Sequence, residues 1–240
     1  MRIGIISDAH GNLEGFEACI ADMGKVDALI FSGDLLGYYF EGPAILRRLR
    51  ALGARCILGN HDEYFLFYQK IKKSSPLKVP DQEEYNSKYG PSFVRAAEDL
   101  TNEEKDWLAS LPYELTMEAG GKRILVVHGS PWAPTEEYVY PDYPHFEKFN
   151  EIDADVVVMG HTHHPMVKTV GKVTLINSGS CGQPRDRDPR ASYGIITIDQ
   201  DHVTGEIHRV PYSQEALLKQ CQELAPDNSL LPTLLLRTSR

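Results

Sequence analysis

The sequence predicts an α/β (α+β) fold in which two mixed β-sheets pack as a sandwich flanked by helices. Between residues 2 and 58, short apolar runs that fit buried strands alternate with stretches of helical periodicity. This β-α-β-α-β order indicates parallel strands joined by right-handed crossovers. Further apolar runs follow residue 122, and the last two are separated by a short polar turn, which predicts an antiparallel hairpin in the same fold.

The elements of the first part follow directly from this periodicity. Leu13, Phe16 and Ile20 recur at helical spacing in the first predicted helix. Pro43 suits the first turn of the second helix, and Gly53 suits a stop after it. The sequence predicts strands at 2–7, 28–31 and 55–58 and helices at 12–23 and 43–52.

The alternation of predicted strands and helices ends after residue 62. A capping-box pattern, Thr101-Asn-Glu-Glu104, starts the last helix of this stretch. We expect helices at 64–73, 81–89 and 101–111, with a proline-containing loop at 74–80. The chain length fits one domain over 1–240 with a helical, cap-like insertion around 64–112.

The last part of the chain supplies the remaining strands and an apolar tail. Strands are predicted at 123–127, 156–159, 173–176, 193–198 and 206–209, with the hairpin turn across 199–204. The tail at 230–236 is apolar and follows a polar break at 226–229. The sequence leaves open whether this tail docks on its own domain or joins a partner subunit in an oligomer.

Composition excludes several classes of function. Hydrophobic residues make up 42% and charged residues 25%, as in ordinary globular proteins. The net charge is −9 and no basic run exists, which argues against general nucleic-acid or membrane binding. No apolar run reaches the roughly 18 residues that a membrane span needs.

Four cysteines without metal spacing predict free thiols. Since Asp8, a candidate ligand, lies so close to the start, we expect no cleaved leader and a cytoplasmic location.

Metal-ligating residue types follow five of the apolar runs. Two carboxylates, four imidazoles and one amide can hold a pair of divalent ions, the arrangement typical of phosphoester hydrolysis. Because the carboxyl ends of parallel strands meet at one edge, we expect a dinuclear site there. The mixed nitrogen and oxygen donors favour Mn, Fe or Zn, with Mg or Ni as alternatives. The candidate ligands are Asp8, His10, Asp34, Asn60, His128, His161 and His163.

In order, these clusters read D-x-H, G-D, G-N-H-[DE], a lone H and G-H-x-H, which resembles the calcineurin-like metallophosphoesterase superfamily. The stretch at 177–192 resembles the N-x-G-S-x-G-Q-P-R segment of its small bacterial and archaeal phosphodiesterase branch. The resemblance implies that Asp34 bridges the two ions. It gives Asp8, His10 and His163 to one ion, and Asn60, His128 and His161 to the other. It also implies that His61 contacts the phosphate and protonates the leaving oxygen.

The leading hypothesis is hydrolysis of a phosphodiester or phosphomonoester bond in a small, nucleotide-like molecule by a hydroxide that both ions activate. One alternative is a serine/threonine protein phosphatase. The arginines that follow the second and third motifs in those enzymes are missing here, which disfavours this reading. Another is a non-catalytic scaffold, a class that commonly loses the ligands this chain retains.

Two further groups of residues bear on the substrate. Arg185, Arg187 and Arg190 follow the last motif, and we expect at least one of them to bind phosphate, foremost Arg185, with Arg190 as a second candidate. The alternative is a local salt-bridge cluster with Asp186 and Asp188. Aromatic residues at 64–68 and 132–149 could stack a nucleobase or pack the insertions against the body.

Overall fold

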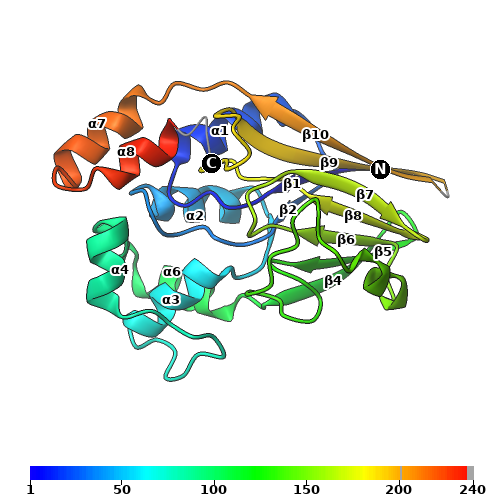
Figure 1. The fold of residues 1–240 in the computed structure, drawn as a ribbon, viewed down its shortest axis with the longest axis horizontal. Coiled ribbons are helices and arrows are strands. Elements are labelled where there is room, and N and C mark those ends of the chain that lie inside the picture. Colours follow the sequence, from blue (N-terminus) through cyan, green and yellow to red (C-terminus); the bar gives the residue numbers. More distant parts are fainter. Residues whose placement is uncertain (201, 237–240) are drawn as a thin grey trace.

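Two five-stranded mixed β-sheets form the centre of the molecule in the computed structural model, which describes residues 1–200 and 202–236 (Figure 1). Ile3, Ile5 and Ile30 of one sheet share a buried core with Val126 and Val158 of the other. The predicted sandwich of two mixed sheets is therefore confirmed.

The first sheet has the strand order β10-β9-β1-β2-β3. Its three parallel strands are followed at one edge by an antiparallel hairpin. The strands are β1 (Arg2–Ile6), β2 (Ala28–Phe31), β3 (Arg55–Cys56), β9 (Ala191–Asp199) and β10 (His202–Val210). The predicted hairpin is present, but β10 starts before the expected residue 206; Asp201, in the expected turn, lies outside the described residues.

The second sheet has the order β4-β5-β6-β8-β7, with parallel strands at its centre and antiparallel strands at both edges. The strands are β4 (Glu114–Ala119), β5 (Lys122–Val127), β6 (Val156–Met159), β7 (Met166–Val170) and β8 (Val173–Asn177). The strands β4 and β7 were not predicted from the sequence. Both are edge strands with one exposed or half-exposed face, so their apolar signal is weak.

Helices cover the first sheet and gather at the end of the molecule opposite the β9–β10 hairpin (Figure 1). Phe16 of α1 and Leu46 of α2 pack with Phe31 in a second core on the outer face of this sheet. The α-helices are α1 (Leu13–Met23), α2 (Gly42–Ala51), α3 (Asn60–Tyr68), α4 (Gln82–Tyr89), α5 (Ser92–Asp99), α6 (Asn102–Ser110), α7 (Glu215–Leu224) and α8 (Leu230–Leu235), and a 3-10 helix, η1, spans Phe146–Glu151.

Helix α3 begins and ends earlier than the predicted helix at 64–73, because it spans Asn60–Tyr68. The Asp62 carboxylate accepts hydrogen bonds from the backbone N–H groups of Gly59 (3.1 Å), Asp34 (3.0 Å), Leu35 (3.0 Å) and Leu36 (2.9 Å). These bonds start the helix at Asn60 and tie it to the loop after β2. The same contacts give Asp62 a structural role.

The apolar tail docks on its own chain. Leu231, Leu234 and Leu235 of α8 are buried together with Tyr39 and Phe40, which follow β2. The Asn228 side-chain amide, just before α8, donates to the Lys88 carbonyl at the end of α4 (3.1 Å). Among the described residues, no helix has both the length and the apolar character needed to cross a bilayer.

Candidate metal centre

The candidate ligands of both sheets meet at one edge of the sandwich. Asp8 and His10 follow β1, Asp34 follows β2, and Asn60 follows β3 in the first sheet. In the second sheet, ligands follow β5 and β6, namely His128, His161 and His163. Parallel strands with their carboxyl ends at a common edge therefore bring together residues that are up to 155 positions apart, the distance from Asp8 to His163 (163 − 8).

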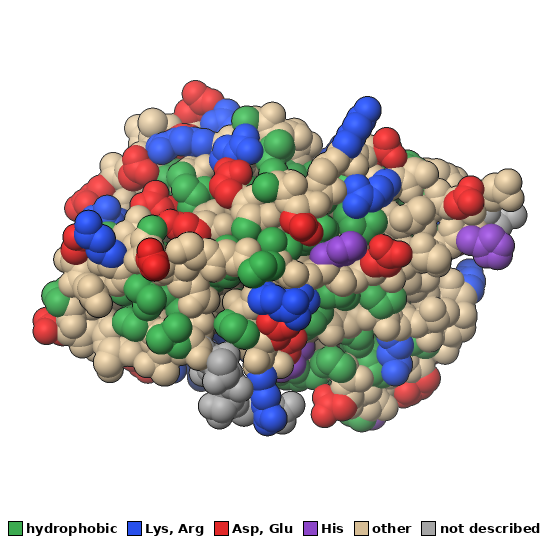
Figure 2. All heavy atoms as spheres, turned by 90° about the horizontal axis from the view of Figure 1, so that it is seen from above, with side chains coloured by type: hydrophobic (Ala, Val, Ile, Leu, Met, Phe, Trp, Pro, Cys, Tyr) green, Lys and Arg blue, Asp and Glu red, His purple; other side chains and the backbone are tan. Residues whose placement is uncertain are grey.

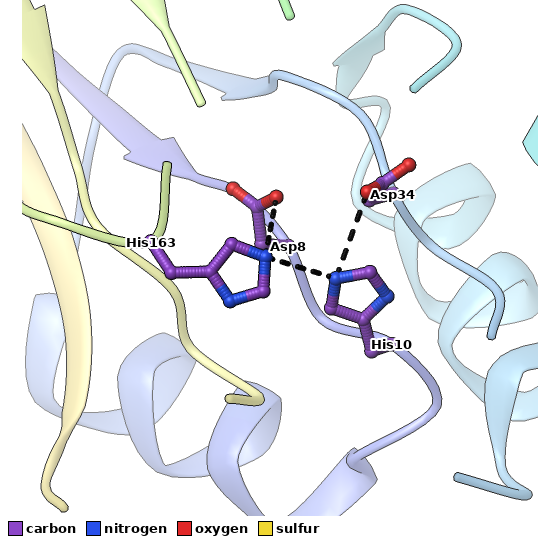
Figure 3. Close-up of side chains that lie close together, drawn as sticks. All are labelled: Asp8, His10, Asp34 and His163. Carbon is purple, nitrogen blue, oxygen red and sulfur yellow. Dashed lines mark hydrogen bonds and ion pairs between the residues drawn. The ribbon is translucent and has the colours of Figure 1, made fainter. Parts of the chain in front are cut away.

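The first cluster joins Asp8, His10, Asp34 and His163 (Figure 3). One potential ligand atom from each lies within 4.8 Å of the others, and all four side chains are buried. His163 Nε2 is 3.3 Å from Asp8 Oδ1, and His10 Nε2 is 3.6 Å from Asp34 Oδ2. This spacing suits a single ion placed among the four ligand atoms.

Two imidazoles in this cluster point unprotonated nitrogens at each other. His10 Nδ1 donates to the Leu36 carbonyl (3.0 Å), and His163 Nδ1 donates to the Gln183 carbonyl (2.6 Å). A carbonyl can only accept, so in each neutral ring the lone pair is at Nε2. The two Nε2 atoms are 3.1 Å apart. Facing lone pairs repel, and a cation bound to both removes the repulsion, as in histidine pairs held by backbone carbonyls at metal sites.

The second cluster joins Asp34, His128 and His161 within the same 4.8 Å limit. His128 Nδ1 donates to the Ser32 carbonyl (2.7 Å), and its Nε2 is 3.3 Å from Asp34 Oδ2. His161 Nε2 donates to the Glu136 carbonyl (3.3 Å), which leaves Nδ1 as its ligand atom. Asp34 belongs to both clusters, so its carboxylate is placed to bridge two ions.

Two buried polar atoms around the second cluster lack hydrogen bonds. Asn60 Oδ1 has no hydrogen-bond partner among the described residues, and His128 Nε2 has its 3.3 Å charge contact with Asp34 Oδ2 but no hydrogen bond. Buried polar atoms nearly always have partners, because an unpaired one costs roughly 1–3 kcal/mol. A metal ion bound to both atoms satisfies them, so the residues present fit a second divalent ion.

The backbone is strained at these positions. Asp8, His10, Asp34, His161 and His163 all have φ between 47° and 66°, in the left-handed region that non-glycine residues rarely adopt. Such strain persists where the surrounding structure enforces it, and it concentrates at functional sites. Here it turns the chain sharply after each strand, so that the ligand side chains converge.

Burial and the close carboxylates shift the pKa values of the cluster in opposite directions. Burial lowers the pKa of His161 to about 3 and that of His163 well below its usual range. Burial raises the pKa of Asp8. Although burial opposes it, the Asp34 carboxylate raises the pKa of His128 to about 9. The floor of the site therefore favours positive charge next to Asp34, which a divalent ion supplies more effectively than a proton.

A cavity of about 1070 Å³ lies above the clusters. Its floor includes Asp34, Asn60, His161 and His163, and His61 lies beside them. His61 Nδ1 is 2.6 Å from the Tyr85 hydroxyl oxygen. Burial lowers the pKa of His61 to about 4, with the Asp34 carboxylate opposing the shift. The predicted catalytic histidine is thus next to the metal clusters and outside both of them.

The arginines separate into two environments. Arg185 lines the cavity, and its Nη2 donates to the Tyr38 hydroxyl oxygen (3.1 Å) and to Gln183 Oε1 (2.8 Å). Arg190 lies outside the described lining of the cavity, and its Nη2 is 2.6 Å from Asp188 Oδ2. Arg187 is exposed. The local salt-bridge interpretation therefore describes Arg190, whereas Arg185 is placed to meet a ligand.

Aromatic side chains form the walls of the cavity. Tyr64, Tyr138 and Tyr140 come from the two aromatic segments singled out in the sequence. Tyr38, Tyr85 and Tyr89 were missed, because a tyrosine in an ordinary loop or helix carries no signal of the cavity it faces. The Tyr138 ring stacks on His161, with 3.8 Å between ring centroids.

Nitrogen and oxygen donors around a shared carboxylate, below an open cavity, define a metal-dependent hydrolase centre. The model of the calcineurin-like phosphoesterase superfamily domain matches residues 1–201. The chain belongs to this superfamily and is a phosphoesterase, so it hydrolyses phosphate esters with the help of metal ions.

Relatives match most of this chain and most of their own length. The uncharacterized protein MJ0912 of Methanocaldococcus jannaschii is 32% identical, over 88% of this chain and 87% of its own. A probable metallophosphoesterase of Methanothermobacter thermautotrophicus is 26% identical, over 87% and 92% of the two chains. The crystal structure of a metallophosphoesterase from Sphaerobacter thermophilus superposes with a TM-score of 0.78, at 31% identity and full coverage of both chains.

Proposed function

We propose that the protein hydrolyses a phosphate ester of a small, nucleotide-like molecule at two divalent ions that share Asp34. The observation that carries this proposal is the membership of Asp34 in both ligand clusters. A shared carboxylate can hold two ions about 3.5–4 Å apart, the spacing of two-metal phosphoesterases.

The chain offers each ion its own set of donors. Asp8, His10 and His163 surround one position with Asp34, and Asn60, His128 and His161 surround the other. Bound there, the ions would polarise phosphoryl oxygens and lower the pKa of a water molecule that becomes the nucleophile. Mixed imidazole and carboxylate donors favour Mn, Fe or Zn over Mg.

Two cavity residues would act on the substrate. His61 has Nδ1 occupied by Tyr85, so its Nε2 is the nitrogen left to protonate the leaving oxygen. Arg185 uses Nε and Nη2 in its bonds to Gln183 and Tyr38, which leaves Nη1 for a phosphate oxygen.

The walls support a substrate with a planar group. The cavity volume of about 1070 Å³ is just above the usual range for small-molecule sites, roughly 300–1,000 Å³. Tyrosine rings can stack on a base, and Lys88 on the rim adds a second positive charge for a phosphate chain. A small molecule fits this arrangement better than a protein surface does, because the ligands lie at the bottom of the cavity.

A polynucleotide is a poor candidate on charge. Figure 2 shows acidic and basic side chains interspersed over one face of the molecule, and the whole chain carries a net charge of −9.

We also propose a cytoplasmic location, which is supported by four buried cysteines with free thiols.

Metal reconstitution with a substrate panel tests the function. Metal-stripped protein receives Mn²⁺, Fe²⁺, Zn²⁺, Mg²⁺ or Ni²⁺, and metal content is measured beside hydrolysis of nitrophenyl mono- and diesters. We expect about two ions per chain and the highest rates with Mn²⁺, Fe²⁺ or Zn²⁺. Nucleotides, cyclic nucleotides, dinucleoside polyphosphates and phosphopeptides follow. Faster turnover of phosphopeptides than of every nucleotide would favour the protein-phosphatase alternative, and a single bound ion at full activity would exclude the dinuclear mechanism.

A further inference from the structure

Tyr85 of helix α4 is the one described residue whose side chain is hydrogen-bonded to the imidazole ring of the catalytic candidate His61. Its hydroxyl oxygen is 2.6 Å from His61 Nδ1, and Tyr85 is almost completely buried. Burial raises the pKa of Tyr85 well above its ordinary value, so the hydroxyl group keeps its proton. A buried hydroxyl needs an acceptor, and among the described residues its hydrogen-bond partner is Nδ1 of His61.

The position of this hydroxyl is fixed by packing. The Tyr85 ring stacks on Phe93 of α5, with 4.4 Å between centroids and 5° between ring planes. Both side chains are at most 2% exposed. A stacked, buried ring has little freedom to move, so its hydroxyl oxygen is a fixed point against which His61 can be oriented.

The loop after β2 leaves room for the pair. Gly37 has φ of +98°, and a Cβ atom there would lie 2.8 Å from His61 Nδ1 and 2.9 Å from the Tyr85 hydroxyl oxygen. Both distances are too short for a carbon atom, so a side chain at this position would displace the hydrogen bond. The absence of a side chain at Gly37 therefore allows the hydrogen bond between His61 and Tyr85 to form.

The other aromatic neighbours of His61 contact its ring but form no hydrogen bond to its ring nitrogens in the described part of the chain. His10 lies edge-on to the ring, with 4.9 Å between centroids, and Tyr38 is 5.0 Å away in a tilted arrangement. These contacts limit the space around the ring, but they do not distinguish Nδ1 from Nε2. The hydrogen bond from Tyr85 does, because it occupies Nδ1 and leaves Nε2 toward the cavity that His61 lines.

We propose that Tyr85 is a positioning residue: its hydroxyl oxygen accepts from Nδ1–H of the protonated His61 ring, so that Nε2–H faces the leaving oxygen, and its hydroxyl group donates to Nδ1 of the neutral ring that remains after proton transfer. The proposal rests on the phosphoesterase function proposed above. A hydroxyl group can donate to Nδ1 of a neutral ring and accept from Nδ1 of a protonated one, so the same contact serves both protonation states.

The primary test is Tyr85→Phe, which removes the hydroxyl group and keeps the ring that packs on Phe93. Rates are measured with Mn²⁺ on phenyl and alkyl phosphates, which have poor leaving groups, and on nitrophenyl phosphate. We expect kcat to fall on the order of tenfold for poor leaving groups, a part of the 10²–10⁴ that a general acid supplies, and to fall less for nitrophenyl phosphate. KM, metal content and melting temperature should stay unchanged.

A double-mutant cycle separates positioning from general packing. In a His61→Ala background, Tyr85→Phe should cause no further loss, because it acts through His61. The matched control is Tyr68→Phe. Tyr68 lies in the same aromatic group, and its hydroxyl donates to the Pro80 carbonyl (2.8 Å) away from His61. Its loss should leave the leaving-group dependence as in the unchanged protein. Gly37→Ala should reproduce the leaving-group dependence of Tyr85→Phe.

A spectroscopic measurement tests the contact without any reaction. Nitrogen NMR of ¹⁵N-histidine in the zinc-loaded protein should show His61 with its proton at Nε2, and Tyr85→Phe should mix the two tautomers. An unchanged His61 spectrum in Tyr85→Phe, an equal loss for good and poor leaving groups, or a full additional loss in the His61→Ala background would each overturn the proposal. If the unchanged protein hydrolyses no phosphate ester, the proposed function fails, and the NMR measurement still decides the role of Tyr85.

Discussion

The floor and the walls of the cavity are built in different ways. The floor consists of carboxylates and imidazoles at strand ends, almost fully buried. Backbone carbonyls hold the imidazoles, and backbone N–H groups hold the carboxylates. The walls consist of tyrosine rings from helices and loops, and two of them, Tyr138 and Tyr140, are 46% and 36% exposed. A rigid floor suits chemistry that depends on fixed donor positions, whereas exposed rings can adjust to the shape of a substrate. From this contrast we expect reaction type and substrate choice to depend on separate parts of one site.

The largest effect should come from the centre of the floor. Asp34→Asn removes the charge that both clusters share, so metal content should fall together with activity, by on the order of 10³-fold or more. Metal analysis and nitrophenyl phosphate hydrolysis measure the two effects. Asp99→Asn is the control, since Asp99 is an exposed partner of Arg47 far from the ligands in the chain. Two ions at full occupancy with normal turnover in Asp34→Asn would refute the bridge.

The second-largest loss of activity is expected at His61, which lines the cavity beside both the metal ligands and the tyrosine rings. His61→Ala should retain both ions and lose 10²–10⁴ in rate, since it removes a proton donor and no ligand. The loss should shrink for nitrophenolate, a leaving group that needs no proton. An equal loss for all leaving groups would assign His61 to phosphate positioning instead.

A smaller effect is expected at Arg185. Arg185→Ala should raise KM for phosphate esters about tenfold, because it removes a charged hydrogen bond worth roughly 1.5–3 kcal/mol. Metal content and melting temperature should not change. Arg190→Ala is the matched control, because Arg190 pairs with Asp188 outside the cavity and should leave KM unaltered. If Arg185→Ala instead lowers the melting temperature and spares KM, its bonds to Gln183 and Tyr38 are structural only.

The smallest effect should come from the walls and should depend on the substrate. Tyr140→Ala removes a ring that lines the cavity, so KM for a nucleotide should rise about fivefold. This factor corresponds to about 1 kcal/mol, the lower end of the range for stacking of a base on an aromatic ring. Activity on nitrophenyl phosphate, which has little to stack, should change less. Trp132→Ala provides a control, because Trp132 is an exposed ring of the same segment outside the described cavity lining. Equal KM changes for both substrates would mean that Tyr140 merely supports the floor.

The same contrast explains which structural predictions succeeded. The capping box at Thr101 and Glu104 and the parallel strands before Asp8 and Asp34 follow from local patterns, and the structure confirms them. The helices α5 and α7 were not predicted, although both carry a helical pattern of apolar residues. The edge strands β4 and β7 lacked a clear local pattern. Their form depends on pairing or packing with distant parts of the chain, which local periodicity does not report.

The sequence by itself determined the family, the two-sheet fold and the set of candidate ligands, because each ligand belongs to a short motif at the end of an apolar run. Only the tertiary structure decided that Arg185 faces the cavity while Arg190 pairs with Asp188. Only the tertiary structure placed Tyr85 against His61 and docked the tail on its own chain. The physical reason is that the ligands share a chemistry visible in their residue types, whereas an arginine, a tyrosine or a leucine acquires its role from the neighbours that folding brings to it.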